Sequence, residues 1–158
     1  FSDIRNESNV PLDNFYWRDI LPTDAVTLRI ISTGTWNEEL KYTIYYKTNL
    51  VSEERALAER LSTSTNNTID CSASALKLKA GEVITEIRFD FGTVQPGFEP
   101  LTNPYITCLV HPDLPHEYRF KNCTDVGGER GDEWVIDKDC WVTVIYAVPK
   151  GKLPKTGN

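Results

Sequence analysis

The chain has 158 residues, of which 40% are hydrophobic and 25% charged, and its net charge is −6. These values suit a single folded, soluble domain and not a disordered segment. They argue against a broad surface for nucleic acid or an anionic membrane, since both need clustered lysine and arginine.

Alternation of apolar and polar residues with a period of two predicts β-strands along most of the chain. The pattern is clear where Tyr42, Ile44 and Tyr46 share one face, opposite Thr43 and Tyr45. Turn-forming residues separate the patterned segments. In chain order, the strands we expect are 14–20, 25–31, 39–47, 82–91, 105–110, 133–136 and 140–148. Short strands in this number favour an all-β fold, an antiparallel β-sandwich.

We expect one short helix inserted in the sandwich, over residues 52–62. Ser52 is a suitable N-cap, and two glutamates follow it in the first turn. Ala56, Leu57 and Leu61 would form its apolar stripe.

The character of the sequence changes after Val148. Pro149 cannot donate a hydrogen bond to a strand ladder, so the last strand should end before it. We therefore divide the chain into a sandwich domain, 1–148, and a short, basic, flexible tail, 149–158. The sequence contains no methionine, no leader-like segment and no apolar stretch of membrane-spanning length, so we interpret it as a fragment or a processed product.

The tail contains the sequence Leu153-Pro154-Lys155-Thr156-Gly157. It resembles the LPXTG sorting signal of sortase-anchored surface proteins of Gram-positive bacteria. The resemblance implies that a sortase thiolate attacks the Thr156 carbonyl and releases Gly157. An amine of a peptidoglycan precursor or of a pilin then accepts the acyl group. It further implies an extracellular location, covalently attached to the cell wall. A complete signal continues with an apolar segment and basic residues, beyond the point at which this sequence stops.

Segments of the body carry a second resemblance. Residues 6–14 with 19–22, and later 91–97, are similar to parts of the conserved repeat domain of bacterial surface proteins. Ser8 stands where the repeat usually has glycine. The resemblance implies an Ig-like sandwich used as a stalk, and it implies no ligand. The polar residues of these segments suit turns, and we interpret Asp19 as a structural, turn-closing residue.

The four cysteines are Cys71, Cys108, Cys123 and Cys140. An even number allows two disulfides in any of three pairings if the chain is exported. The candidate disulfide cysteines are Cys108, Cys123 and Cys140, and the pairing stays open.

The sequence offers two candidate metal sites. A zinc site would combine Cys108 and Cys123 with His111 and His116, but residues three apart on a strand point to opposite faces. Calcium could use the acidic region 125–139, which lacks EF-hand spacing and suits a solvated loop equally well. We expect no metal and no cofactor.

Two further features concern binding and covalent stapling. Trp17 and Trp141 are the tryptophans least securely buried by alternation, and they are the candidate ligand-facing aromatics of a carbohydrate-binding module. An isopeptide bond, which staples many surface sandwiches, would need a lysine in the apolar interior. Lys77, Lys79 and Lys121 are candidates for that lysine.

The sequence contains no G-x-S-x-G, no P-loop and no H-E-x-x-H pattern, so we expect no enzyme. The function we expect is a cell-wall-anchored stalk or adhesin module whose partners are a sortase and the acceptor amine. The alternative is a carbohydrate-binding module on a surface protein, with a host or glycan ligand.

Overall fold

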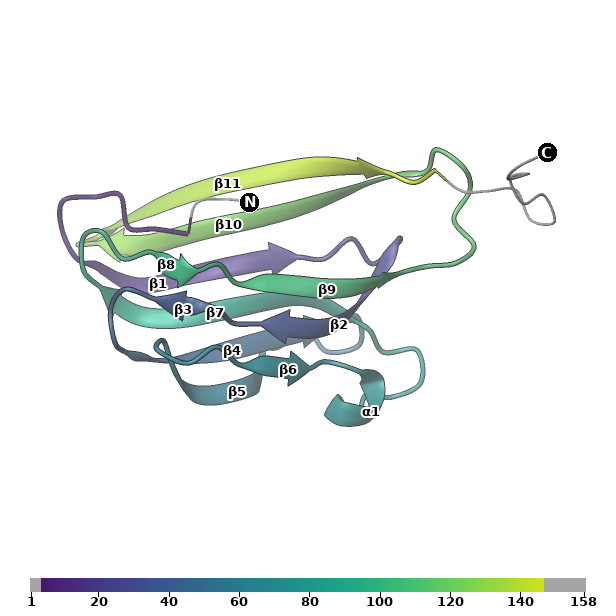
Figure 1. Cartoon of the computed structure of the whole chain (residues 1–158), viewed down its shortest axis with the longest axis horizontal. Helices are drawn as coiled ribbons and strands as arrows, with labels where there is room; N and C mark the ends of the chain where they lie inside the picture. Colours follow the sequence, from purple (N-terminus) through teal and green to yellow (C-terminus); the bar gives the residue numbers. More distant parts are fainter. Residues whose placement is uncertain (1–3, 147–158) are drawn as a thin grey trace, which may run out of the picture.

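The structure is a computed structural model, and it describes residues 4–146. Two layers of antiparallel β-strands pack face to face as a sandwich (Figure 1), which confirms the all-β expectation. In chain order the elements are β1 (Leu12–Ile20), β2 (Val26–Ser32), β3 (Thr35–Trp36), β4 (Lys41–Thr48), β5 (Arg55–Ser62), β6 (Thr68–Asp70), α1 (Ala73–Leu76), β7 (Ile84–Val94), β8 (Pro100–Thr102), β9 (Tyr105–Val110), β10 (Arg119–Arg130) and β11 (Glu133–Val144).

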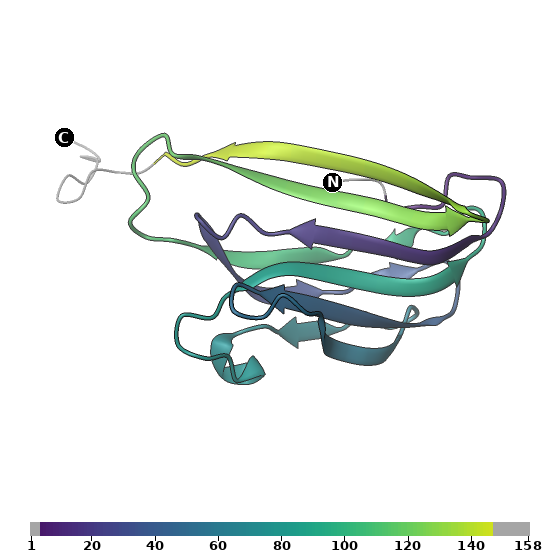
Figure 2. The ribbon, with the colours of Figure 1, turned by 180° about the vertical axis from the view of Figure 1, so that it is seen from behind.

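The two layers differ in width. The larger sheet has the strand order β11-β10-β1-β7-β4-β5 and faces the viewer in Figure 2. The smaller layer combines the sheet β6-β2-β9 with the short pair β3-β8 and lies in front in Figure 1. The hairpin of β10 and β11 extends beyond this smaller layer, and most side chains of β11 are exposed. The edge strand β9 of the smaller layer therefore lies on the side of the sandwich that faces this hairpin.

An aromatic core fills the space between the layers. The ring of Trp17 on β1 packs edge-on against Phe89 on β7, with centroids 5.0 Å apart. Trp36 stacks on Phe98 at 5.1 Å, and Phe91 contacts both of those rings. Large buried rings of this kind contribute much of the hydrophobic stabilisation of a small domain.

Most expected strands are confirmed, and β9 begins and ends where the alternation predicts. The two strands expected at 133–136 and 140–148 form one strand, β11, as far as Val144. Residues 147–148 lie outside the described part of the chain.

The glycines at 127 and 128 belong to β10, although a pair of glycines is typical of a turn. A Cβ at Gly127 would lie 2.9 Å from the Tyr16 ring, and one at Gly128 would lie 2.9 Å from the Leu12 Cβ. Both residues are glycine because β1 packs bulky side chains against this part of β10.

The expectation of a helix over 52–62 is wrong, because residues 55–62 form β5. This edge strand pairs with β4, and Ala58 lies opposite Ile44. Pairing with the sheet outweighs the local helix signals, since propensity is a weak prior. The helix that does form, α1, has four residues and is capped by Ser72, whose hydroxyl accepts from the Ala75 N–H. The described chain thus has no helix that could cross a membrane.

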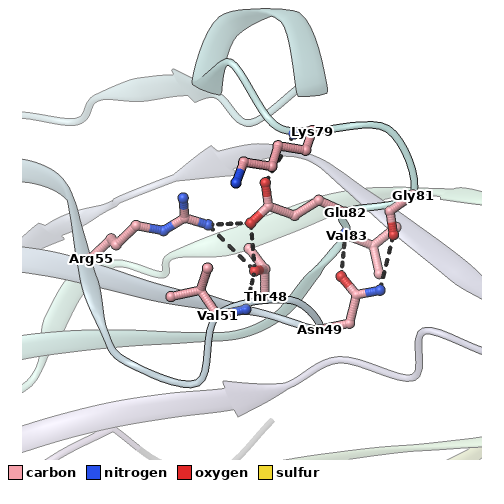
Figure 3. A network of polar contacts seen from close by, with 8 residues as sticks. All are labelled: Thr48, Asn49, Val51, Arg55, Lys79, Gly81, Glu82 and Val83. Atoms are coloured by element: carbon pink, nitrogen blue, oxygen red, sulfur yellow. Dashed lines mark hydrogen bonds and ion pairs between the residues drawn. The ribbon is translucent and has the colours of Figure 1, made fainter.

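A buried carboxylate holds the loops beside β4, β5 and β7 together (Figure 3). Glu82 Oε2 accepts from Thr48 Oγ1 at 2.7 Å and from Arg55 Nη2 at 2.6 Å, while its Oε1 accepts from the Lys79 N–H at 2.9 Å. These bonds lower the pKa of Glu82 to about 2, with the Thr48 bond as the largest cause.

Candidate functional site

A hollow of about 270 Å³ lies between the end of β1, the edge strand β9 and the β10–β11 hairpin. We call it the Asp19 hollow. Its floor consists of buried side chains from β1, β2, β10 and the turn after β1: Asp19, Leu21, Pro22, Val26 and Asn122.

The rim of the Asp19 hollow is half-buried and mostly apolar. It consists of Ile106 and Cys108 from β9, Phe120 from β10, and Trp141 and Thr143 from β11. The chain therefore forms an apolar depression that opens to solvent and has polar groups at its base, the usual composition of a small-ligand site.

Asp19 faces the interior because it lies on the same face of β1 as Phe15 and Trp17, four and two positions earlier. Its side chain is 2% exposed, and its Oδ1 accepts no hydrogen bond from the described residues. Burial raises the pKa of Asp19 to about 7, although a side-chain hydrogen bond with Asn122 lowers it in part. The expectation of a turn-closing Asp19 is thus wrong, since the carboxylate points into the sandwich.

Asn122 lies on the inner face of β10, directly opposite Trp141 on β11. It is 8% exposed, and within residues 4–146 its Oδ1 has no hydrogen-bond donor. Two side chains that line one hollow therefore each carry a buried acceptor oxygen without a donor. Asp19 was expected only in a turn and Asn122 in no site, although a carboxylate in phase with Phe15 and Trp17 is a signal that the sequence contains.

The cysteines divide between a bond and two free thiols. Cys123 and Cys140 face each other across β10 and β11 and form a disulfide, whereas Cys71 and Cys108 are free. Cys108 is thus not a disulfide cysteine, and its thiol lines the hollow instead. Burial raises the pKa of Cys108 to about 11 and that of Cys71 to about 12, so both thiols stay protonated and unreactive at neutral pH.

The two candidate ligand-facing tryptophans have different surroundings. Trp17 is 2% exposed and packs in the core, so no ligand can reach it and that expectation is wrong. Trp141 is half-buried on the rim of the Asp19 hollow. Of the two candidate tryptophans, only Trp141 could therefore contact a ligand.

The residues of the candidate metal sites have other neighbours. His111 Nε2 lies 3.1 Å from Thr27 Oγ1, and the His116 ring packs edge-on against Tyr146. In the acidic region, Asp125 is paired with Arg18 through Nε at 2.8 Å. Within the described part of the chain, no three His, Cys, Asp or Glu side chains are grouped to hold a metal ion.

The lysines considered for an isopeptide bond do not lie in the interior. Lys77, Lys79 and Lys121 are all exposed, as are Lys41 and Lys138, while Lys47 is half-buried. The described chain thus places no lysine in the apolar interior that such a bond would require.

The sequence Leu153–Gly157, with its candidate sortase-recognition residues, lies outside the described residues. Comparison with models of protein families, with curated proteins and with solved structures finds no match to this chain.

Proposed function

We propose that the chain is the sandwich domain of a cell-wall-anchored surface protein, in which it serves as a stalk or adhesin module and is the substrate of a sortase transpeptidase. The observation that carries this proposal is the sequence Leu-Pro-Lys-Thr-Gly at 153–157. In this chemistry the Thr156 carbonyl is attacked by the enzyme thiolate, Gly157 leaves with its amine, and an acceptor amine then displaces the enzyme.

The position of the motif relative to the fold supports the proposal. Strand β11 ends at Val144, and Leu153 follows it nine positions later. Covalent geometry allows a segment of that length to reach about 30 Å from the strand end. A sortase groove can therefore take up the motif without unfolding β11.

The Cys123–Cys140 disulfide supports an extracellular location. Disulfides form and persist in oxidising compartments and are rare in the reducing cytosol. This bond joins the last two long strands, so it also braces the part of the sandwich from which a wall-attached tail would pull.

A transpeptidation assay tests the proposal. The chain is incubated with a class A sortase and a short amine nucleophile, and intact mass is measured. We expect loss of the dipeptide Gly157-Asn158 and gain of the nucleophile at Thr156. As a matched pair, Thr156→Val should abolish the reaction, whereas Lys155→Ala, at the variable position of the motif, should leave it intact. An inert chain beside a cleaved control peptide contradicts the proposal.

A further inference from the structure

Two residues that line the Asp19 hollow each carry a buried acceptor oxygen without a donor. These oxygens are Asp19 Oδ1 and Asn122 Oδ1, and residues 4–146 supply neither with a hydrogen bond. A buried acceptor without a donor costs about 1–3 kcal/mol, and a carboxylate costs more. A donor supplied from outside the described chain would remove this cost.

Asp125 has the hydrogen-bond donors that Asp19 Oδ1 lacks. Asp125 lies on the adjacent strand and is also buried, but Arg18 and Tyr16 donate three hydrogen bonds to its carboxylate. Asp19 neighbours Arg18 in the sequence and faces the other side of the sheet. In the described chain no lysine or arginine forms an ion pair with it. Cys108, a titratable group that faces it from β9, stays a neutral thiol well above neutral pH.

The walls of the hollow are suited to an aliphatic chain. Leu21 and Val26 lie at the base, and Phe120 and Trp141 stand at the rim. The volume of about 270 Å³ exceeds that of an engineered apolar cavity that binds benzene, about 150 Å³. An aromatic rim also attracts a cation through its π-face.

We propose that the Asp19 hollow binds a primary alkylammonium group, the chemistry of a lysine side chain. Its three N–H donors match Asp19 Oδ1 and Asn122 Oδ1, its charge matches the carboxylate, and its methylene chain packs against the apolar rim. A divalent metal fits less well, because calcium takes six to eight oxygen ligands and the hollow offers few. This inference is independent of the sortase proposal.

Titration of the ¹⁵N-labelled chain at pH 8 tests the site, because most Asp19 side chains are ionised there. The probes are n-pentylammonium and 1-pentanol, which have the same chain and differ in charge and donors. We expect saturable shifts at the amides of Asp19, Cys108 and Asn122, with at least tenfold tighter binding of the ammonium. Equal binding of the two probes, or no binding of either, overturns the proposal.

A pair of charge-removing variants assigns the selectivity to Asp19. Asp19→Asn should reduce ammonium affinity at least tenfold and leave pentanol binding intact, so the alcohol reports that the hollow is still formed. The matched control, Asp132→Asn, removes a carboxylate at the far tip of the hairpin, about 30 Å away at strand spacing. Unchanged ammonium affinity in Asp19→Asn overturns the proposal.

Two further probes distinguish the sources of the group. Nα-acetyl-lysine-N-methylamide represents a lysine of a protein partner, and 1,5-diaminopentane represents a free polyamine. Tighter binding of the lysine derivative assigns the site to a protein partner, and tighter binding of the diamine assigns it to a small amine. Failure of both overturns the proposal, since both carry the same ammonium group.

Discussion

The guanidinium of Arg18 on β1 donates two hydrogen bonds to the carboxylate of Asp125 on β10, with Nε 2.8 Å from Oδ1 and Nη2 2.9 Å from Oδ2. Tyr16 donates its hydroxyl to the same carboxylate at 2.6 Å. The Asp125 side chain is 6% exposed. This bidentate ion pair therefore joins the β10–β11 hairpin to the rest of the larger sheet on its outer face.

Arg18→Leu should destabilise the fold by about 3 kcal/mol, because it leaves a buried carboxylate with a single neutral donor. Urea unfolding at pH 7 measures the loss as a lower midpoint with an unchanged slope. The matched control is Arg130→Leu, which breaks an exposed pair with Glu133 and should cost less than about 1 kcal/mol. Equal losses in the two variants would contradict the structural role of the Arg18–Asp125 pair.

The disulfide between Cys123 and Cys140 should also carry measurable stability. Its sequence separation of 17 corresponds to about 3 kcal/mol from the reduced entropy of the unfolded chain. The double variant Cys123→Ser, Cys140→Ser should lose that amount in urea unfolding, and a reductant should produce the same shift in the wild type. Cys108→Ser is the control, since its thiol is free. A reductant-insensitive midpoint would argue against the bond.

Protonation of Glu82 at acid pH should lower the stability of the fold (Figure 3). Its pKa in the fold is about 2, below the ordinary glutamate value, because Thr48, the Lys79 N–H and Arg55 donate to the carboxylate. A lowered pKa means that this stabilisation is present above about pH 4.5 and is lost as pH falls through 2. Glu82→Gln should therefore be less stable than the wild type at pH 7 and nearly equal to it at pH 2.

Chemical denaturation at both pH values measures the Glu82 effect. Glu53→Gln, at an exposed position, controls for the general loss of one carboxylate. A gap between wild type and Glu82→Gln that stays constant with pH would show that the network stabilises through packing and not through charge.

The sandwich was predictable from the sequence because alternation is a local property of each strand. Strands such as β4 and β9 are half-buried on a regular face, so their pattern can be read without knowledge of their neighbours. β5 was not predictable, since Ser52, two glutamates and three apolar residues imitate a helix start. Only the neighbouring strand β4 makes residues 55–62 extend.

The site was less accessible to sequence reasoning than the fold. Gly127 and Gly128 carry the usual turn signal, and it takes the Tyr16 and Leu12 side chains of β1 to show that they lie within a strand. Because β10 was missed, Asn122 had no assigned face and could not be placed beside Asp19. Asp19 and Asn122 are 103 positions apart in the chain, so their proximity in the fold produces no local pattern in the sequence.

Asp19 links pH to stability in the direction opposite to Glu82. Its pKa is raised from 3.8 to about 7, chiefly by burial, so the folded state holds a proton that the unfolded chain releases. The stability that depends on this proton is complete below about pH 4 and is lost as pH rises through 7. The rise of the Asp19 pKa from 3.8 to about 7 corresponds to about 4 kcal/mol.

Asp19→Asn cannot ionise, so the difference in unfolding free energy between this variant and the wild type isolates the carboxylate. We expect the unfolding free energy of the variant to increase relative to that of the wild type as pH rises from 4 to 8, by as much as about 4 kcal/mol. Urea unfolding of both chains at steps of one pH unit measures the gap. Asp132→Asn is the control, and its gap should stay flat because its side chain is exposed. A flat gap for Asp19→Asn would mean that water reaches the carboxylate and that the donor-free oxygen of the hollow is already satisfied.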